Sequence, residues 1–189
     1  MRQQIRELVQ AIRPWDQLEA LQREDVLRWI ESGADLCRTQ KPATPPRHLV
    51  SYFVVVDPDA RRVLLVDHIK AQKWLPTGGH VEPDEHPRDT VIREAREELA
   101  LVADFLIPET FFVTQTQTVG LTAGHADVSL WYVMKGDSNA RLAYDPGEFK
   151  AVRWFDYVEV LGMDIEQLDP HMHRFVGKWM RRGGELVKA

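Results

Sequence analysis

Three glutamates near the middle of the chain have a spacing that could hold a metal ion. Glu94, Glu97 and Glu98 lie three and four positions apart, so on an α-helix their side chains share one face within about one turn. Like charges placed this way repel each other unless a positive group lies among them. Two interpretations are open: an ordinary solvated helix surface, or a site for a hard cation such as Mg²⁺ or Mn²⁺, whose remaining ligands come from water and phosphate.

The residues that precede these glutamates favour the cation site. Gly78-Gly79 allows the backbone to turn tightly or to come close to a ligand. Glu85 and Arg93 carry opposite charges and are expected to pair. His86-Pro87 predicts a helix start with proline at the first helical position. A glycine turn, a charged loop and an acidic helix are therefore predicted at one place.

The same helix has an apolar stripe on another face. At about 100° per residue, four apolar side chains point away from the glutamates: Val91, Ile92, Ala95 and Leu99. Such a stripe is typical of a helix that packs on a core. The glutamates are therefore expected to face solvent or a cleft.

The stretch from Gly79 to Leu101, GHVEPDEHPRDTVIREAREELAL, resembles the signature box of the Nudix hydrolases. The first glycine and every charged position match, and the lead-in at residues 74–82 is similar to that family's approach to the box. Two positions differ. Ala100 stands where the family usually has glycine, which could alter how the helix ends, and Ala95 stands where a bulky aliphatic residue is common. Neither difference removes a carboxylate.

This resemblance implies both a fold and a chemistry. The fold is an α/β/α sandwich with a mixed β-sheet. The activity is hydrolysis of a phosphoanhydride bond in a nucleoside diphosphate linked to another group, in which the three glutamates carry catalysis and bind Mg²⁺ or Mn²⁺ with a further ligand from the Gly79 carbonyl. We expect Glu94 to combine metal binding with the role of general base. Glu85 and Arg93 are expected to support the site without touching the substrate.

Two other functional classes are weighed against this one. A minority of proteins that resemble the family bind a nucleotide or nucleotide sugar as sensing modules without turnover, and those generally lack box glutamates. All are present here, so we predict an enzyme and keep the sensing module as the alternative. Another branch isomerises isopentenyl diphosphate with a catalytic cysteine in its core. Cys37, the only cysteine, lies well before the box, which argues against that branch.

Apart from Glu82, the candidates for substrate contacts lie outside the box, where the sequence is less specific. The candidates are Trp74, Glu82, His125, Asp127 and Glu148. Glu82 could extend the acidic cluster. Glu148 precedes an expected strand where some relatives have a glutamate that reaches the metal centre, and a solvated loop position is its alternative. His125 and Asp127 would point to the same side of a strand, although a lone histidine is more often structural.

Aromatic residues and two later histidines are harder to assign. Trp74, Trp131 and Tyr132 could stack on a base, whereas aromatic residues in strands usually belong to the core. His171 and His173 near the last helix are expected on the surface.

The chain is predicted to divide into a helical extension with a proline-rich connector, residues 1–46, and a Nudix hydrolase domain, residues 47–189. Helical spacing of apolar residues recurs at Ile5, Leu8, Val9 and Ile12. Asp16 and Glu19 predict the capped start of a second helix that ends at Gly33. Its apolar positions are Leu18, Leu21, Val26, Leu27 and Ile30.

The two helices are apolar on one side only, so they must dock on something. That partner is either the hydrolase domain or a second copy in a homodimer, and the extension could also supply a wall or lid to the substrate pocket. The connector Lys41–Pro46 is expected to be stiff and extended.

Strands are predicted at residues 49–56, 62–66, 109–119, 125–135 and 149–155. The first two form a hairpin across Asp57–Ala60. Asp169-Pro170 predicts the start of a last amphipathic helix, which ends at Gly183-Gly184.

Composition narrows the range of partners. The 189 residues, 44% of them hydrophobic, suffice for one domain with some additions. A net charge of −5 argues against a large basic face for duplex nucleic acid, whereas a small nucleotide bridged by metal remains compatible. No run of about eighteen apolar residues predicts a membrane span, and one cysteine excludes an internal disulfide. A cytoplasmic location is expected.

Overall fold

The computed structural model describes residues 1–41, 44–118 and 124–183. Within these ranges seven strands form one sheet, in the order β3-β2-β1-β6-β5, with β4 added to β1 and β7 added to β2. The strands are β1 Arg47–Asp57, β2 Arg62–His68, β3 Lys73–Leu75, β4 Thr77–His80, β5 Phe105–Gln117, β6 Ala126–Lys135 and β7 Phe149–Asp156. Only β1 and β6 pair in parallel, so the sheet is mixed as predicted.

Strand β1 is the centre of the sheet and divides its partners along its length. Its carboxyl end pairs with β2 through Val56 and Val63, which confirms the predicted hairpin. Its amino-terminal half pairs with β4, where Ser51 lies opposite Gly79. The glycine turn of the box is thereby attached to the middle of the sheet.

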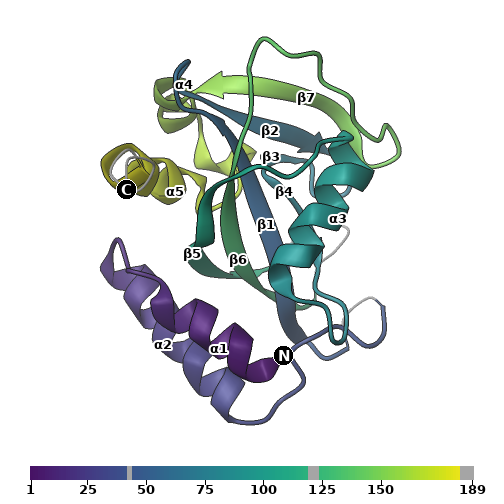
Figure 1. The fold of residues 1–189 in the computed structure, drawn as a ribbon, viewed down its shortest axis with the longest axis vertical. Helices are drawn as coiled ribbons and strands as arrows, with labels where there is room; N and C mark the ends of the chain where they lie inside the picture. Colours follow the sequence, from purple (N-terminus) through teal and green to yellow (C-terminus); the bar gives the residue numbers. More distant parts are fainter. Residues whose placement is uncertain (42–43, 119–123, 184–189) are drawn as a thin grey trace.

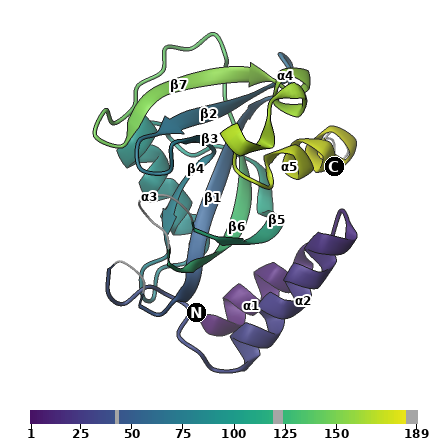
Figure 2. The ribbon, with the colours of Figure 1, turned by 180° about the vertical axis from the view of Figure 1, so that it is seen from behind.

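Helices cover both faces of this sheet, because alternate residues of β1 belong to two apolar clusters. Phe53 and Val55 pack in the cluster that contains α3 (Pro87–Leu99). Val54 and Val56 pack in the cluster that contains α4 (Tyr157–Gly162) and α5 (Met172–Lys178). Both views show α3 and α5 on opposite sides of the sheet (Figures 1 and 2). The predicted α/β/α sandwich is confirmed.

The predicted acidic helix is α3, and its boundaries follow local chemistry. The Arg88 N–H donates to His86 Nδ1 at 3.1 Å, and Pro87 occupies the first turn. The apolar stripe is narrower than predicted: Val91, Ala95 and Leu99 are buried, whereas Ile92 is 45% exposed. Ile92 lies outside the contact between the helix and the sheet. Helical periodicity alone does not predict how wide that contact is.

The end of α3 explains the preference for glycine at the position of Ala100. This residue caps the helix in the left-handed conformation with φ 52°, and the Leu101 N–H donates to the Ala95 carbonyl at 2.9 Å. A Cβ atom makes this conformation unfavourable, whereas glycine adopts it without a steric penalty. Ala100 therefore keeps the usual helix end at some cost in stability.

Ala100→Gly is therefore expected to stabilise the protein by about 0.5–1 kcal/mol, measured by urea unfolding. The matched control is Ala20→Gly inside α2 (Gln17–Glu31), where glycine weakens a helix by about 1 kcal/mol. A loss of stability in both variants would contradict the argument from the backbone angle.

The N-terminal extension docks on the rest of the same chain. Helices α1 (Arg2–Ala11) and α2 pack on β5, and Figure 1 shows them side by side next to the sheet. The Asp16 cap is confirmed, since its carboxylate accepts from the Glu19 N–H at 2.8 Å. Asp16 also accepts two hydrogen bonds of 2.7 Å from Arg174 of α5. These contacts join the start of α2 to α5.

Two details of the extension differ from the prediction. Leu18 and Leu21 are exposed, because α2 turns Val26, Trp29 and Ile30 toward the core instead. The connector is not extended throughout: the Thr39 N–H donates to the Thr44 carbonyl at 2.8 Å, so the chain folds back there. Residues 42 and 43 of the predicted connector lie outside the described ranges.

The later elements agree with the prediction except at their ends. Strand β5 begins before the predicted start, and residue 119 is outside the described ranges. The short strands β3 and β4 and helix α4 were not predicted. Helix α5 begins at Met172, because Asp169 does not cap it but accepts from the His171 N–H at 2.8 Å. A π-helix at Trp179–Gly183 follows, and the predicted end at Gly184 is not described.

No helix in the described ranges is both long and apolar enough to cross a membrane.

Candidate active site

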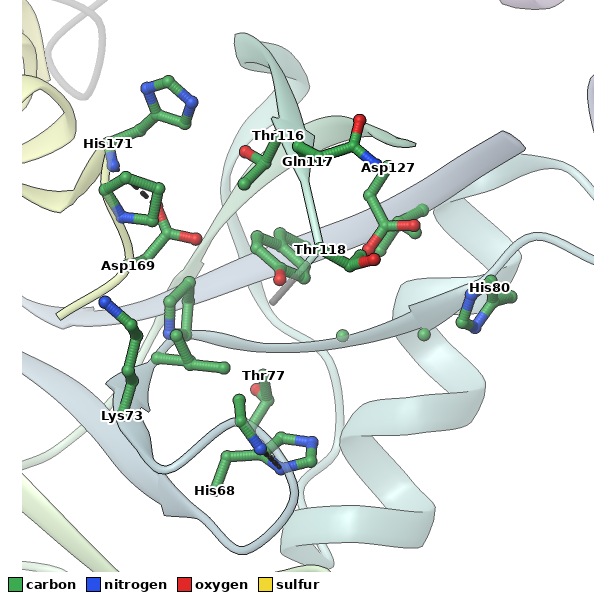
Figure 3. A pocket seen from close by; sticks show the side chains of 18 of the residues that line it. His68, Lys73, Thr77, His80, Thr116, Gln117, Thr118, Asp127, Asp169 and His171 are labelled. Atoms are coloured by element: carbon green, nitrogen blue, oxygen red, sulfur yellow. Dashed lines mark hydrogen bonds between the residues drawn. The ribbon is translucent and has the colours of Figure 1, made fainter. Parts of the chain in front are cut away.

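A cavity of about 640 Å³ lies beside the glycine turn of β4. Side chains reach it from β1, β4, the ends of β5 and β6, and the segment before α5, as Figure 3 shows. Glu98 is the box glutamate on its wall, together with Gly78 and Gly79. The sequence pattern therefore coincides with a cavity, which is where small-molecule sites usually lie.

The three predicted glutamates share one face of α3 but differ in environment. Glu98 is buried, and its Oε2 atom has no hydrogen-bond partner among the described residues. Glu94 is 13% exposed and accepts from Arg93 Nη1 at 2.5 Å, whereas Glu97 is 62% exposed and lies 3.7 Å from the same guanidinium. The face therefore runs from solvent at Glu97 to a buried, unpaired oxygen at Glu98.

Gly79 allows the helix and the sheet to approach each other. A Cβ atom at this position would lie 1.8 Å from Glu94 Oε1. At Gly78 it would lie 2.2 Å from the Ser51 carbonyl oxygen of β1. Glycine at both positions is thus a steric requirement, and at Gly79 it brings the Glu94 carboxylate against the backbone of the turn.

Arg93 ties the loop before α3 to the acidic face. Its Nε and Nη2 donate to the two Glu85 carboxylate oxygens at 3.0 and 3.1 Å, and Nη2 also donates to the His80 carbonyl at 3.3 Å. Glu85 accepts further from the Glu82 N–H at 3.0 Å and from Thr90 Oγ1 at 2.8 Å. The expected pair is present, and it positions Glu94 and the turn together.

The acidic face is electrostatically unfavourable without a cation. Burial, followed by the charges of Glu94 and Glu148, raises the pKa of Glu98 to about 9. Burial likewise raises the pKa of Glu94, although Arg93 opposes the shift. Glu148 lies in the loop before β7, close enough for its charge to act on both. A buried carboxylate with an unpaired oxygen, beside further carboxylates, fits a hard divalent cation bound by oxygen ligands.

The raised pKa of Glu98 predicts how stability depends on pH when a chelator keeps cations away. The unfolded chain loses this proton near pH 4.5, whereas the folded chain holds it up to about pH 9. Its contribution to stability is therefore complete below pH 4.5 and falls as pH rises toward 9. We expect the Tm of Glu98→Gln, relative to wild type, to increase steadily over that range. The exposed Glu109→Gln is the control, and a parallel increase in it would contradict the assignment.

Among the substrate candidates, His125 and Asp127 are brought together on the cavity wall, with 3.3 Å between His125 Nε2 and Asp127 Oδ1. Two further histidines that the sequence reasoning did not single out, His48 and His80, join them. Burial and then the charge of Arg38 lower the pKa of His80 to about 3. His48 lies at the start of β1, and His125 lies just before β6, which pairs with β1 in parallel. A histidine at the start of each of two predicted strands is the signal in the sequence that could have indicated this group.

Other candidates lie elsewhere. Trp74 is not on the cavity wall and packs edge-to-face on Phe155, with ring centroids 4.9 Å apart. Trp131 and Tyr132 are fully buried in the two cores. Glu82 is exposed and off the wall. The expected surface position of His171 is wrong, because this residue is buried and lines the cavity, as Figure 3 shows; His173 is half-buried.

Comparison with known proteins gives one consistent result. The sequence model of the NUDIX domain matches residues 46–178. A MutT protein from Methanosarcina mazei Go1 is similar in structure, with TM-score 0.58 and 18% identity over 73% of this chain and 96% of that one. A NUDIX-family hydrolase from Clostridium perfringens has TM-score 0.55 and 22% identity over 71% and 97% of the two chains.

A third solved structure, the dihydroneopterin triphosphate pyrophosphohydrolase of E. coli, has TM-score 0.54 and 15% identity over 76% of this chain and 98% of that one. At these identities the solved structures are evidence of a common fold. No curated protein sequence matches this chain.

Proposed function

Because this chain belongs to the NUDIX domain family and is a hydrolase of acid anhydrides in phosphorus-containing compounds, we propose that it is a pyrophosphohydrolase dependent on Mg²⁺ or Mn²⁺. Its substrate is a nucleoside diphosphate linked to another group. The observation that supports this proposal is the Glu98 carboxylate, buried on the cavity wall with one oxygen unpaired among the described residues.

The chain's own residues would bind the cation and the substrate. Glu94, Glu97 and Glu98 supply carboxylate oxygens, and the Gly79 carbonyl is the further ligand. When bound, the ion neutralises charge on the pyrophosphate oxygens and makes a bound water more acidic. Arg93 holds Glu94 against the turn through its contacts with Glu85 and the His80 carbonyl.

We assign the general base to Glu94. Its raised pKa, caused first by burial, brings it closer to neutrality, where a base that takes a proton from water is most effective. Glu148, in the loop before β7, adds negative charge near the acidic face, and this charge raises the pKa of both Glu94 and Glu98. His125 and Asp127 are proposed to contact the substrate from the cavity wall. A volume of about 640 Å³ is within the usual range for small-molecule pockets.

A substrate panel tests this proposal. Purified protein with millimolar Mg²⁺ is incubated with nucleoside triphosphates, dinucleoside polyphosphates, ADP-ribose and nucleotide sugars, and released phosphate, pyrophosphate and nucleotides are measured. Turnover of at least one class, abolished by a chelator and restored by Mg²⁺ or Mn²⁺, is expected. No product from any class would refute the assignment. A nucleotide that raises Tm and survives incubation unaltered would instead indicate the sensing module.

The extension also has a proposed role in the site. Arg38, from the segment after α2, lies on the cavity wall and donates from Nη1 to His80 Nε2 at 3.1 Å. We propose that residues 1–46 complete this wall for the hydrolase domain at 47–189.

The homodimer stays a prediction, and sedimentation analysis checks it. The exposed Leu18 and Leu21 on α2 form the surface to alter first.

A further inference from the structure

We propose that His48, His80, His125 and Asp127 form a second metal site at the wall of this cavity, one that selects a transition-metal ion such as Zn²⁺; His80, His125 and Asp127 line the cavity, and His48 lies buried behind them. One ligand atom from each of these residues lies within 4.8 Å of those of the others. The site is distinct from the box glutamates in both residues and ligand chemistry. It does not depend on the proposed hydrolysis of a nucleotide.

Sheet register brings the four residues together. His48 of β1 is the direct partner of Asp127 of β6, and His80 of β4 is the partner of Val50, two residues further along β1. Side chains two positions apart on a strand point to the same face, as do those of directly paired residues. The His48 ring lies 4.8 Å from that of His80 and 4.7 Å from that of His125, centroid to centroid.

In His48 and His125, Nδ1 has a hydrogen-bond partner, which leaves Nε2 available to bind a metal. His48 Nδ1 lies 2.8 Å from the Pro45 carbonyl, which can only accept, so that nitrogen carries the proton. His125 Nδ1 lies 3.4 Å from Thr118 Oγ1, and this hydroxyl already donates to the His125 carbonyl. A ring that carries its single proton on Nδ1 presents a lone pair at Nε2, which is the arrangement found in metal-binding histidines.

Those two lone pairs meet a carboxylate oxygen. Asp127 Oδ1 lies 3.3 Å from both His48 Nε2 and His125 Nε2. Over the residues the structure describes, neither His48 Nε2 nor Asp127 Oδ1 has a hydrogen-bond partner, although both atoms are buried. Buried polar atoms are nearly always paired. Acceptor atoms directed at one another at this distance are favourable only when a positive centre lies between them, either a proton on Nε2 or a metal ion.

The donor set predicts which ion binds. Imidazole nitrogens with one carboxylate suit Zn²⁺, Co²⁺ or Ni²⁺, whereas Mg²⁺ prefers oxygen ligands alone. Arg38 donates to His80 Nε2, so this histidine joins the ion only when the guanidinium moves aside. With three ligands from His48, His125 and Asp127, the fourth position is open to water or to a substrate oxygen, as in zinc sites that bind substrate.

Cobalt(II) is the probe for this site, because a four- or five-coordinate site gives it visible absorption. Untagged full-length protein is stripped with a chelator, returned to excess Mg²⁺ and titrated with Co²⁺. We expect one Co²⁺ per chain, a visible absorption band, and its loss on adding one equivalent of Zn²⁺. Asp127→Asn and His48→Gln should each weaken Co²⁺ binding tenfold or more.

Three variants serve as controls that locate the ion. Glu98→Gln removes a box ligand, His171→Gln removes another histidine of the cavity wall, and Cys37→Ser removes the only thiol. All three should keep the Co²⁺ band. Loss of the band in Glu98→Gln, or its persistence in His48→Gln with His125→Gln, would place the ion elsewhere and overturn the proposal.

The wild-type titration guards against variants that do not fold. If stripped wild-type protein in Mg²⁺ binds no Co²⁺ and gains no Tm from Zn²⁺, the four residues are a hydrogen-bonded cluster without a metal. Hydrolysis with Mg²⁺ is measured separately on the same preparation, so failure of the transition-metal site and failure of the proposed activity are distinguishable.

Discussion

Glu98→Gln is expected to lower kcat by on the order of 10²–10³ while the protein remains folded. Glutamine keeps the size of the side chain but lacks the charge that would hold a divalent cation, and Glu98 is the box residue whose unpaired oxygen lies on the cavity wall. The measurement is steady-state turnover at saturating Mg²⁺ with the best substrate of the panel, together with Mn²⁺ affinity by electron paramagnetic resonance. The kcat and the affinity for Mn²⁺ should both decrease.

One further variant on the acidic face and one control variant outside the site test this interpretation. Glu97→Gln, on the exposed part of the same face, should cost about a hundredfold if that carboxylate also binds the ion. Glu109→Gln on β5, an identical chemical change at an exposed position outside the site, should leave kcat unchanged. Unchanged turnover in Glu98→Gln with the fold intact would show that the cation binds elsewhere.

Lys178→Met is expected to destabilise the protein by about 3–5 kcal/mol, because it leaves a buried carboxylate without its partner. Lys178 Nζ donates to Glu19 Oε1 at 2.6 Å and to the Phe111 carbonyl at 2.5 Å, and both charged side chains are almost fully buried. Burial raises the pKa of Glu19 and lowers that of Lys178, and their mutual attraction opposes both shifts.

For a chain of this length the loss corresponds to a decrease in Tm of roughly 6–20 °C. Thermal and urea unfolding measure it. The exposed pair between Arg62 and Asp156 provides the control, since Arg62→Met should cost about 1 kcal/mol or less. Glu19→Gln combined with Lys178→Met should recover part of the stability, because no buried charge is then unpaired. Equal small losses in Lys178→Met and Arg62→Met would contradict this account.

Much of the box was predictable from the sequence, because its geometry is local. Glu94, Glu97 and Glu98 share a face through helix periodicity alone, and Glu85 reaches Arg93 eight residues later across one loop and one helix turn. The start of α3 at Pro87 follows from the restricted backbone of proline. The long apolar runs of β1 and β2 likewise predicted strands buried on both faces.

What the sequence did not reveal depends on contacts between distant segments. Periodicity placed Ile92, Leu18 and Leu21 on apolar stripes, but the width of each contact with the sheet decided that they are exposed. Glu19 of α2 and Lys178 of α5, which form a buried ion pair, are 159 residues apart in the sequence.

The histidine group shows the same limit. His48, His80 and Asp127 meet only because β1 pairs with β4 on one edge and with β6 on the other, in one particular register. A shift of one residue would turn each side chain to the opposite face of the sheet. The acidic helix and the glycine turn can be predicted from the residues alone, because both depend on short-range backbone geometry. The residues that share the cavity with them are known only from the folded chain, because the packing of the whole core sets the strand register and the docking of the helices.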